Sequence, residues 1–213
     1  MKDKNKIFNF AKKIIDHPRS LSGFGVRKTL DDIKKILPNL KIKSFKSGNN
    51  VFDWKIPKEW EVNDAYIVTP EGKKICEYKK NPLHLVGYSI PIKKSLNKNG
   101  LLKNLHSLPH LKNAVPYITS YYKKNWGFCI SHNQKKKLKK GIYKIHIDTK
   151  LKKGVINYGE LIIKGKSKKE ILLSTYICHP KMANNEISGI SVLTYLSKWI
   201  LSKKRNFSYR IIF

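Results

Sequence analysis

The chain has 213 residues, of which 40% are hydrophobic, enough apolar material for one sizeable core or for a core with a small satellite domain. Its formal net charge of +31 is carried almost entirely by lysines scattered from end to end, whereas base-reading and bidentate phosphate sites favour arginine. No apolar run approaches the roughly 18 residues of a membrane helix, and no signal-peptide pattern follows the N-terminus. We therefore expect a cytoplasmic protein with no membrane partner and no specific nucleic-acid site.

Two helices are predicted at the start of the chain. Apolar residues recur at three- and four-residue spacing in residues 3–16 and again in 26–37, which is the pattern of helices with one buried face. The loop between them is rich in Pro, Ser and Gly, and Pro38 ends the second helix.

A change of pattern marks residues 41–133, where short β-like runs alternate with turns. Pro70-Glu71-Gly72 reads as the turn of a hairpin, and one helix is predicted at residues 101–108. The predicted strands are residues 51–54, 65–69, 74–78 and 85–91. We expect these residues to form a small β-rich module with an aromatic core.

The last part of the chain has an α/β pattern. After a lysine-rich helix at residues 134–140, strands are predicted at 142–148, 155–163, 171–178 and 208–213, with a helix at 187–202. The continuous apolar run 171–178 is typical of a strand buried on both faces. We therefore predict an α/β domain made of residues 1–40 and 134–213, interrupted by an inserted domain at 41–133.

The loop after the strand at 171–178 carries the most chemistry. His179 is expected at the strand end, where ligands gather in such sheets, and Asn185 and Glu186 come just before the next helix. An imidazole and an oxygen ligand can converge on one Zn²⁺ ion at about 2.0–2.2 Å. By spacing alone, a helix cap or a hydrogen-bonded His–Glu pair is the commoner explanation. The metal hypothesis therefore needs further support.

That support comes from a resemblance that covers essentially the whole chain. The loop resembles the first metal-ligand loop of zinc aminopeptidases, in which a His at a strand end is followed by an Ala-x-Asp-Asn-x-x-Gly-type segment. More closely, the chain resembles aminopeptidase-like proteins encoded among bacterial surface-polysaccharide genes, which carry an inserted β-rich module. The segments that carry this resemblance are residues 19–27, 51–54, 57–60, 84–89, 116–122, 126–129, 158–161 and 174–180.

The resemblance implies a zinc-peptidase-like mixed sheet flanked by helices and metal-assisted hydrolysis of a small peptide or aminoacyl-like substrate. It makes His179 the first zinc ligand, and it places Asn185 where the family has a bridging Asp. Asn offers only a neutral carbonyl, so Glu186 is the other candidate for the missing oxygen ligand. The family's later ligands and its Glu base have no counterpart before Phe213. We therefore expect a C-terminally truncated chain that does not hydrolyse peptides alone and that forms an oligomer or needs a complementing chain.

Two other functions stay open at this point. A non-catalytic binding protein could keep the peptidase fold, and Asn185 favours that alternative. A general polyanion or nucleic-acid binder would follow from the net charge alone, with steep salt dependence and no sequence preference.

Overall fold

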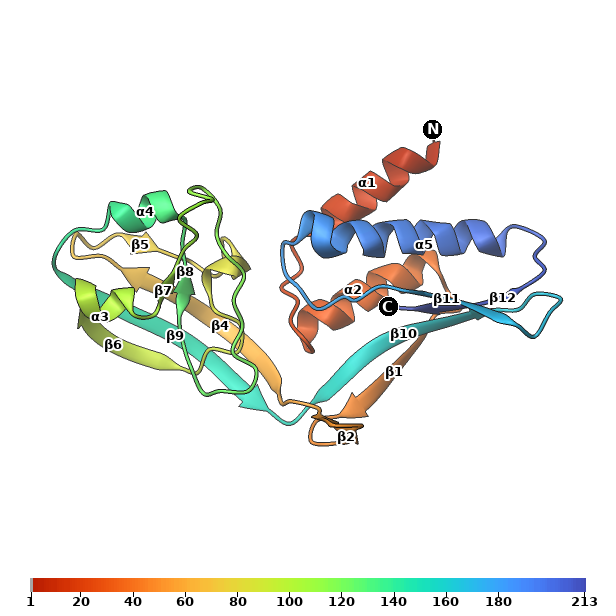
Figure 1. Cartoon of the computed structure of the whole chain (residues 1–213), viewed down its shortest axis with the longest axis horizontal. Coiled ribbons are helices and arrows are strands. Elements are labelled where there is room, and N and C mark those ends of the chain that lie inside the picture. Colours follow the sequence, from red (N-terminus) through yellow and green to blue (C-terminus); the bar gives the residue numbers. More distant parts are fainter. Residues whose placement is uncertain (1) are drawn as a thin grey trace. The chain divides into compact units, whose positions relative to one another are not determined.

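The computed structural model of the chain describes residues 2–213, with side chains from Lys4 onward (Figure 1). The chain forms two compact units. One contains the residues up to Glu59 together with Lys153–Phe213, and the other contains Trp60–Lys152. Each unit contains a four-stranded sheet. In the described part of the chain, no helix combines the length and the apolar character needed to cross a membrane.

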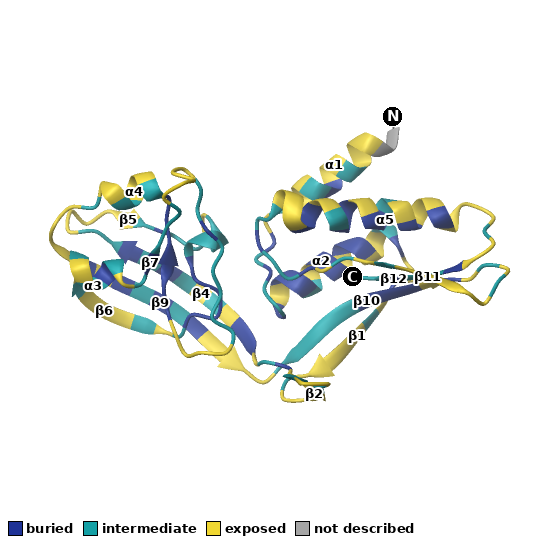
Figure 2. Cartoon of the chain, in the orientation of Figure 1, coloured by how far each residue is buried: buried dark blue, intermediate teal, exposed yellow. Residues whose placement is uncertain are grey.

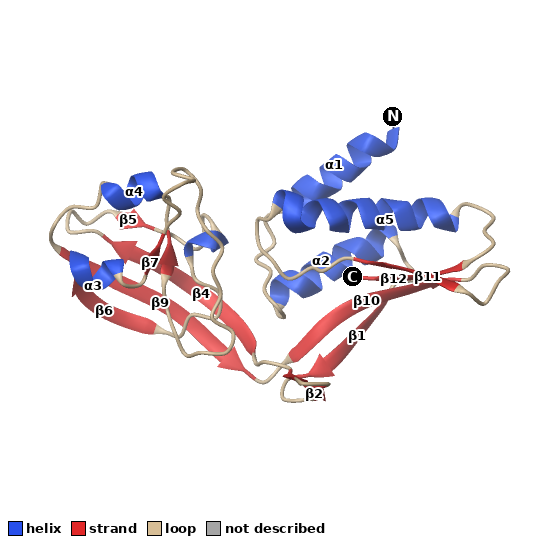
Figure 3. Cartoon of the chain, viewed as in Figure 1, coloured by secondary structure: helices blue, strands red, loops and turns tan. Residues whose placement is uncertain are grey.

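The first unit is a mixed sheet with helices packed on it (Figure 3). Its strands lie in the order β1 (Lys41–Lys46), β10 (Val155–Ile163), β12 (Ser208–Ile212) and β11 (Glu170–Ser174). The parallel strands β11 and β12 are joined through helix α5 (Ser188–Leu201), which confirms the predicted βαβ unit, whereas β10 runs antiparallel to β1 and β12. The remaining elements of this unit are α1 (Lys2–Ile14), α2 (Phe24–Ile36), a π-helical turn η2 (Ala183–Ile187) and the short strands β2 (Asn50–Val51) and β3 (Trp54–Lys55).

The core of this unit lies between the helices and the sheet (Figure 2). In α2 the predicted three- and four-residue spacing is confirmed, because Val26, Leu30 and Ile33 are all buried. They belong to one cluster with Leu161 of β10 and Ile211 of β12. Burial of this apolar stripe holds the helix on the sheet.

Helix α5 brings hydroxyl groups into the same core. The hydroxyls of Thr194 and Ser197 are buried and donate to the carbonyl oxygens of Ile190 and Leu193, each at 2.7 Å. These bonds satisfy the hydroxyls inside the helix, so their burial carries no unpaired polar group. Trp199 lies outside the buried face of this helix, because it is exposed.

The second unit is built around a sheet with the order β5 (Lys74–Ile75), β4 (Glu59–Val68), β9 (Ile142–Lys152) and β6 (Ile92–Asn97). The predicted hairpin turn is confirmed: β4 and β5 pair antiparallel across Pro70-Glu71-Gly72, with Ile67 opposite Ile75. The predicted strand at 85–91 is wrong, since only isolated bridges occur there. The remaining elements are a 3-10 turn η1 (Pro82–His84), helices α3 (Lys98–Leu102) and α4 (His132–Lys136), and strands β7 (Leu105–His106) and β8 (Phe128–Cys129).

The division into units differs from the predicted boundaries at 40/41 and 133/134. Strand β1 belongs to the first unit because it pairs along its full length with β10, from Lys41 opposite Glu160 to Lys46 opposite Val155. Strand β9 belongs to the second unit because it pairs with β6 and neighbours β4. Both differences arise from strand pairing between segments that are distant in sequence.

Candidate functional site

The candidate site lies on the segment that joins β11 to η2 and α5. The predicted strand at 171–178 is too long, because β11 ends at Ser174. It is also not buried on both faces, since it is the edge strand of its sheet and Ile171 and Leu172 are exposed. His179 therefore lies in the connecting segment, five residues beyond the strand rather than at its last position.

A π-helical turn, η2, contains both Asn185 and Glu186. The amide N–H of Ile187 donates to the carbonyl oxygen of Met182, five residues earlier, at 3.0 Å. This wider turn is a local departure from α-helical geometry that recurs at functional sites. Within this turn, Glu186 is fully buried while Asn185 is exposed.

The structure brings together His179 and Glu186, as predicted. The imidazole Nδ1 of His179 donates to Oε2 of Glu186 at 2.6 Å, and the His179 backbone N–H lies 2.7 and 2.9 Å from the two carboxylate oxygens. Glu186 thus fixes both the backbone and the ring of His179. Because a carboxylate oxygen only accepts, Nδ1 carries the proton and Nε2 is left as the nitrogen that can bind a ligand or metal.

Arg19 completes this network from the loop between α1 and α2. Its Nε donates to the carbonyl oxygen of His179 at 2.9 Å and to Oε1 of Glu186 at 3.3 Å, and its Nη1 donates to the carbonyl oxygen of Ile14 at 2.6 Å. The side chains of Arg19 and Glu186 are both fully buried. Burial lowers the pKa of the Arg19 guanidinium, and the charge of Glu186 opposes this effect. The pair ties two distant loops together at the site.

The protonation of His179 depends on its neighbours. Hydrogen bonds to the Cys178 sulfur and to the Glu186 carboxylate raise the pKa of His179 to about 9, against a smaller opposing effect of burial. A metal at Nε2 must therefore displace a proton at neutral pH. The displaced proton makes zinc affinity dependent on pH.

The donor set fits a zinc ion in type. The ligand atoms of Cys178, His179 and Glu186 all lie within 4.8 Å of one another, and Zn²⁺ takes sulfur, nitrogen and oxygen ligands. Two ligands of one tetrahedral zinc ion lie about 3.4 Å apart, whereas Nδ1 of His179 is 2.6 Å from Glu186. That pair is hydrogen-bonded, so the geometry favours Nε2 as the ligand atom and Glu186 as its orienting partner.

Asn185, the third predicted residue, lies on the exposed side of the turn. Its Oδ1 accepts from the hydroxyl of Tyr176 at 3.2 Å, and the Tyr176 ring stands edge-on to the His179 ring with centroids 5.4 Å apart. Tyr176 thus links Asn185 to His179. Sequence reasoning missed Tyr176 and Arg19 as parts of the site, although Arg19 is one of only four arginines among 45 basic residues.

Comparison with known proteins agrees with this architecture. A Clostridium acetobutylicum protein, named for polysaccharide biosynthesis with an aminopeptidase-like domain, is 42% identical over 208 residues, which cover 98% of this chain and 48% of that protein. A crystal structure named as that of a candidate peptidase from the same organism superposes with a TM-score of 0.94 at 42% identity, covering 98% of this chain and 49% of the other. The chain thus spans about half the length of the curated relative it matches.

Distant structural relatives show the same fold. A zinc aminopeptidase from Bacillus subtilis superposes with a TM-score of 0.62 at 12% identity, covering 99% of this chain and 60% of the other. The predicted fold class and the predicted resemblance are confirmed. A sequence profile of the family described as "Domain of unknown function (DUF4910)" matches residues 8–213. The chain therefore belongs to this family and has an aminopeptidase-like fold.

Proposed function

We propose that this chain supplies the first metal-binding segment of a zinc aminopeptidase-like hydrolase, with Nε2 of His179 as the ligand atom. The observation that carries the proposal is the 2.6 Å hydrogen bond from Nδ1 of His179 to Glu186. Metal-ligating histidines almost always donate their other ring N–H to a carboxylate or carbonyl, which fixes the tautomer and the ring orientation. Arg19 in turn holds Glu186 in place through a hydrogen bond to its other carboxylate oxygen.

Glu186, which the sequence offered as a possible zinc ligand, has a different role in this proposal. Glu186 is an orienting residue here, because both of its oxygens already accept hydrogen bonds from His179 or Arg19. Asn185 offers a neutral oxygen that is linked to the His179 ring through Tyr176, and it is the remaining candidate from this segment. Its lack of charge makes it a weak zinc ligand, so a mononuclear site fits this chain better than a dinuclear one.

In this proposal the reaction is hydrolysis of a small peptide or aminoacyl-like amide. Zinc, when bound, would polarise the amide carbonyl and activate a water for attack. The reaction also needs a carboxylate base and further ligands, but Glu186 is the only acid after His179 and is engaged by Arg19. Residues corresponding to the other half of the longer relatives would supply these groups, and a link to polysaccharide biosynthesis rests on the name of one relative.

A binding protein without catalysis is the second candidate. Asn185 stands where the resemblance calls for a bridging carboxylate, and the carboxylate of Glu186 is buried in an ion pair with Arg19. A site without a free carboxylate could bind a ligand but would not activate a water molecule for hydrolysis. This alternative predicts weak zinc binding or none.

Zinc retention and amide hydrolysis together test both candidates. The chain, His179→Ala and His110→Ala are dialysed against Zn²⁺, and bound metal and turnover of leucyl-p-nitroanilide are measured. His110 is an exposed histidine of the second unit and serves as the matched control. We expect zinc in the chain and in His110→Ala, much less in His179→Ala, and no turnover by any of them. Equal zinc in His179→Ala would rule out the site, whereas turnover that His179→Ala abolishes would show that this chain completes it alone.

A further inference from the structure

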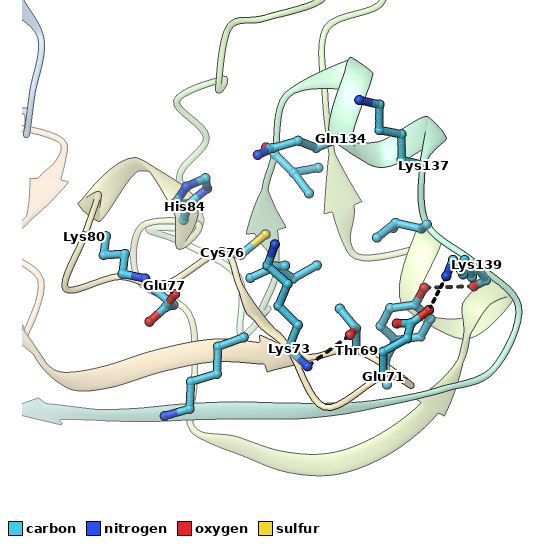
Figure 4. A pocket seen from close by; sticks show the side chains of 15 residues that line it. Thr69, Glu71, Lys73, Cys76, Glu77, Lys80, His84, Gln134, Lys137 and Lys139 are labelled. Atoms are coloured by element: carbon cyan, nitrogen blue, oxygen red, sulfur yellow. Dashed lines mark hydrogen bonds and ion pairs between the residues drawn. The ribbon is translucent and has the colours of Figure 1, made fainter.

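The second unit contains a pocket that the proposed hydrolase site does not use. Its volume is about 580 Å³, within the range of small-molecule sites. It opens between the β4–β5 turn, η1 and the segment that runs from α4 to β9 (Figure 4). All of its lining residues lie within Trp60–Lys152, so the pocket belongs to one compact unit.

The inner wall of this pocket is apolar and uncharged. Cys76, Ile130 and Tyr143 are buried there. The Tyr143 hydroxyl donates to the carbonyl oxygen of Lys139 at 2.8 Å, so its polar group is satisfied within the protein. Burial raises the pKa of the Cys76 thiol and keeps it neutral. A ligand group that contacts this wall therefore loses its surrounding water and packs against carbon and sulfur atoms.

The rim is strongly basic. Five lysines line the pocket against two glutamates, and the lysines are Lys73, Lys74, Lys80, Lys137 and Lys139. Both glutamates are already paired: Glu77 with Lys80 at 2.6 Å and Glu71 with Lys139 at 3.3 Å. The rim thus keeps an excess of positive charge after its internal ion pairs are formed.

Three of the five lysines have partners in the protein. Besides Lys80 and Lys139, Lys74 places its ammonium 4.0 Å from the centre of the Tyr66 ring. Among the residues that the structure describes, Lys73 and Lys137 have no carboxylate partner. Figure 4 shows Lys73 extending from the β4–β5 turn toward Cys76, whereas the ammonium of Lys137, at the end of α4, points away from Cys76. The flexible stem of a lysine allows a change of rotamer that would bring this second ammonium to a ligand in the pocket. The pocket thus combines an apolar wall with two ammonium groups available to a ligand.

We propose that this pocket binds a small organic anion whose apolar body rests on the inner wall and whose phosphate or carboxylate meets Lys73 and Lys137. Lysine is suited to this task because its ammonium acts as a compact point charge for phosphate. The general charge of the chain would attract any polyanion weakly. The apolar wall adds a requirement for a hydrophobic part, and this requirement distinguishes the pocket from the rest of the basic surface.

Binding of 2-naphthyl phosphate, which combines both chemical parts, tests the proposal. Its affinity for the 213-residue chain is compared with that of inorganic phosphate and of 2-naphthol by NMR titration of the amide resonances. We expect 2-naphthyl phosphate to bind about tenfold or more tightly than either part alone, because both the charge and the apolar area contribute. We also expect its shift changes to be confined to the pocket residues.

A charge-matched pair of variants separates the pocket from simple attraction to a basic protein. The double variant Lys73→Glu/Lys137→Glu should lose at least about tenfold in affinity, since reversal replaces attraction by repulsion. The control is the double variant Lys103→Glu/Lys123→Glu. Both of these lysines are exposed and belong to the same unit but lie outside the pocket, and their replacement alters the net charge by the same amount. Equal losses in the two variants, equal binding of inorganic phosphate, or shift changes spread over the surface would each overturn the proposal.

Discussion

The four arginines of this chain show how individual residues hold the structure together. Each one makes at least two side-chain hydrogen bonds: Arg19 at the candidate site, Arg27 to both oxygens of Glu59 at 2.9 Å, Arg205 to carbonyl oxygens at the end of α5, and Arg210 to Glu160 and Glu170. A planar guanidinium can bond several acceptors in fixed directions, which the lysine ammonium cannot. In a chain whose cations are nearly all lysine, an arginine therefore indicates a position where geometry matters.

The buried pair of Arg19 and Glu186 should contribute strongly to stability. Glu186→Gln keeps the size of the side chain but leaves the Arg19 charge buried without compensation, so we expect a loss of about 3 kcal/mol in the free energy of unfolding. Glu61→Gln removes an exposed partner of Lys152 and should cost less than about 1 kcal/mol. Urea unfolding followed by circular dichroism measures both. Similar losses in the two variants would contradict the role assigned to the buried pair.

His17 should make the stability depend on pH. It is buried and donates from Nδ1 to the Thr29 hydroxyl at 3.1 Å, since that hydroxyl itself donates to Gly25. Burial, with smaller contributions from Lys28 and Arg19, lowers its pKa to about 4, whereas an unfolded imidazole titrates near 6.5. Above pH 6.5 both states are neutral, but between about 6.5 and 4 only the unfolded state binds a proton, so stability falls as the pH is lowered.

The size of this effect is roughly 2 kcal/mol after allowance for solvent screening. The variant His17→Asn keeps a donor at the position of Nδ1 and removes the titrating group. Its free energy of unfolding, measured between pH 7 and 4, should fall less steeply than that of the unchanged chain. The same slope in both proteins would show that other groups cause the acid sensitivity.

At the scale of elements, the apolar pattern predicted the βαβ unit but not the geometry of its first connection. Ile177 is buried in the core although it lies beyond the end of β11, so an apolar run continued where the strand pairing had stopped. Periodicity cannot distinguish a paired strand from an extended buried segment. The π-helical turn was likewise not predicted, because the sequence pattern indicates the start of a helix but not its hydrogen-bond spacing. The sequence therefore identified His179 and Glu186 as neighbours and offered a hydrogen-bonded pair as one explanation, but it did not predict that Glu186 is buried.

The start of α2 is held close to the loop that carries Arg19, and Gly25 permits this approach. A Cβ at Gly25 would lie 2.3 Å from the carbonyl oxygen of Pro18 and 2.7 Å from the backbone nitrogen of Arg19. An alanine in place of a helical glycine ordinarily stabilises by up to about 1 kcal/mol, but here overpacking against backbone should destabilise by about 2 kcal/mol. Thermal or urea unfolding of Gly25→Ala measures the net effect.

Gly72→Ala is a useful comparison for this prediction. Gly72 has a positive φ of 80° but open space around it, so its substitution should cost only the backbone strain of about 1 kcal/mol. Gly25→Ala should also weaken zinc retention, because it displaces the loop of Arg19, whereas Gly72→Ala should not. A Gly25→Ala variant as stable as the unchanged chain would contradict the close approach.

At the scale of the whole molecule, the chain consists of two units whose boundaries the sequence located only approximately. The inserted β-rich module was predicted from a change of pattern at residues 41 and 133, but the structure divides the chain near residues 59 and 152. The residue pattern of a segment predicts that it forms a strand, but it does not predict which other strand it pairs with. Lys41 of β1 meets Glu160 of β10, and no local property of either segment indicates that contact.

The second unit should fold when it is separated from the first. It has its own sheet and its own buried residues, including Ile67, Phe128 and Tyr143. In addition, β4 and β9, which carry its two ends, are neighbours in that sheet. We expect residues 60–152 expressed alone to show a β-type circular dichroism spectrum and one cooperative thermal transition. A spectrum of an unfolded chain, or a transition without cooperativity, would show that this unit depends on the first.

The two ring nitrogens of His179 can be observed separately, and they report directly on the proposed zinc ligand. Long-range ¹H–¹⁵N NMR spectra of the ¹⁵N-histidine-labelled chain, with and without Zn²⁺, report the state of each nitrogen. We predict that zinc moves the Nε2 resonance of His179 to a metal-bound position while Nδ1 stays protonated against Glu186. We also predict that Glu186→Gln weakens this binding about tenfold or more. Zinc bound at Nδ1, or at other histidines with His179 unchanged, would contradict the proposed ligand.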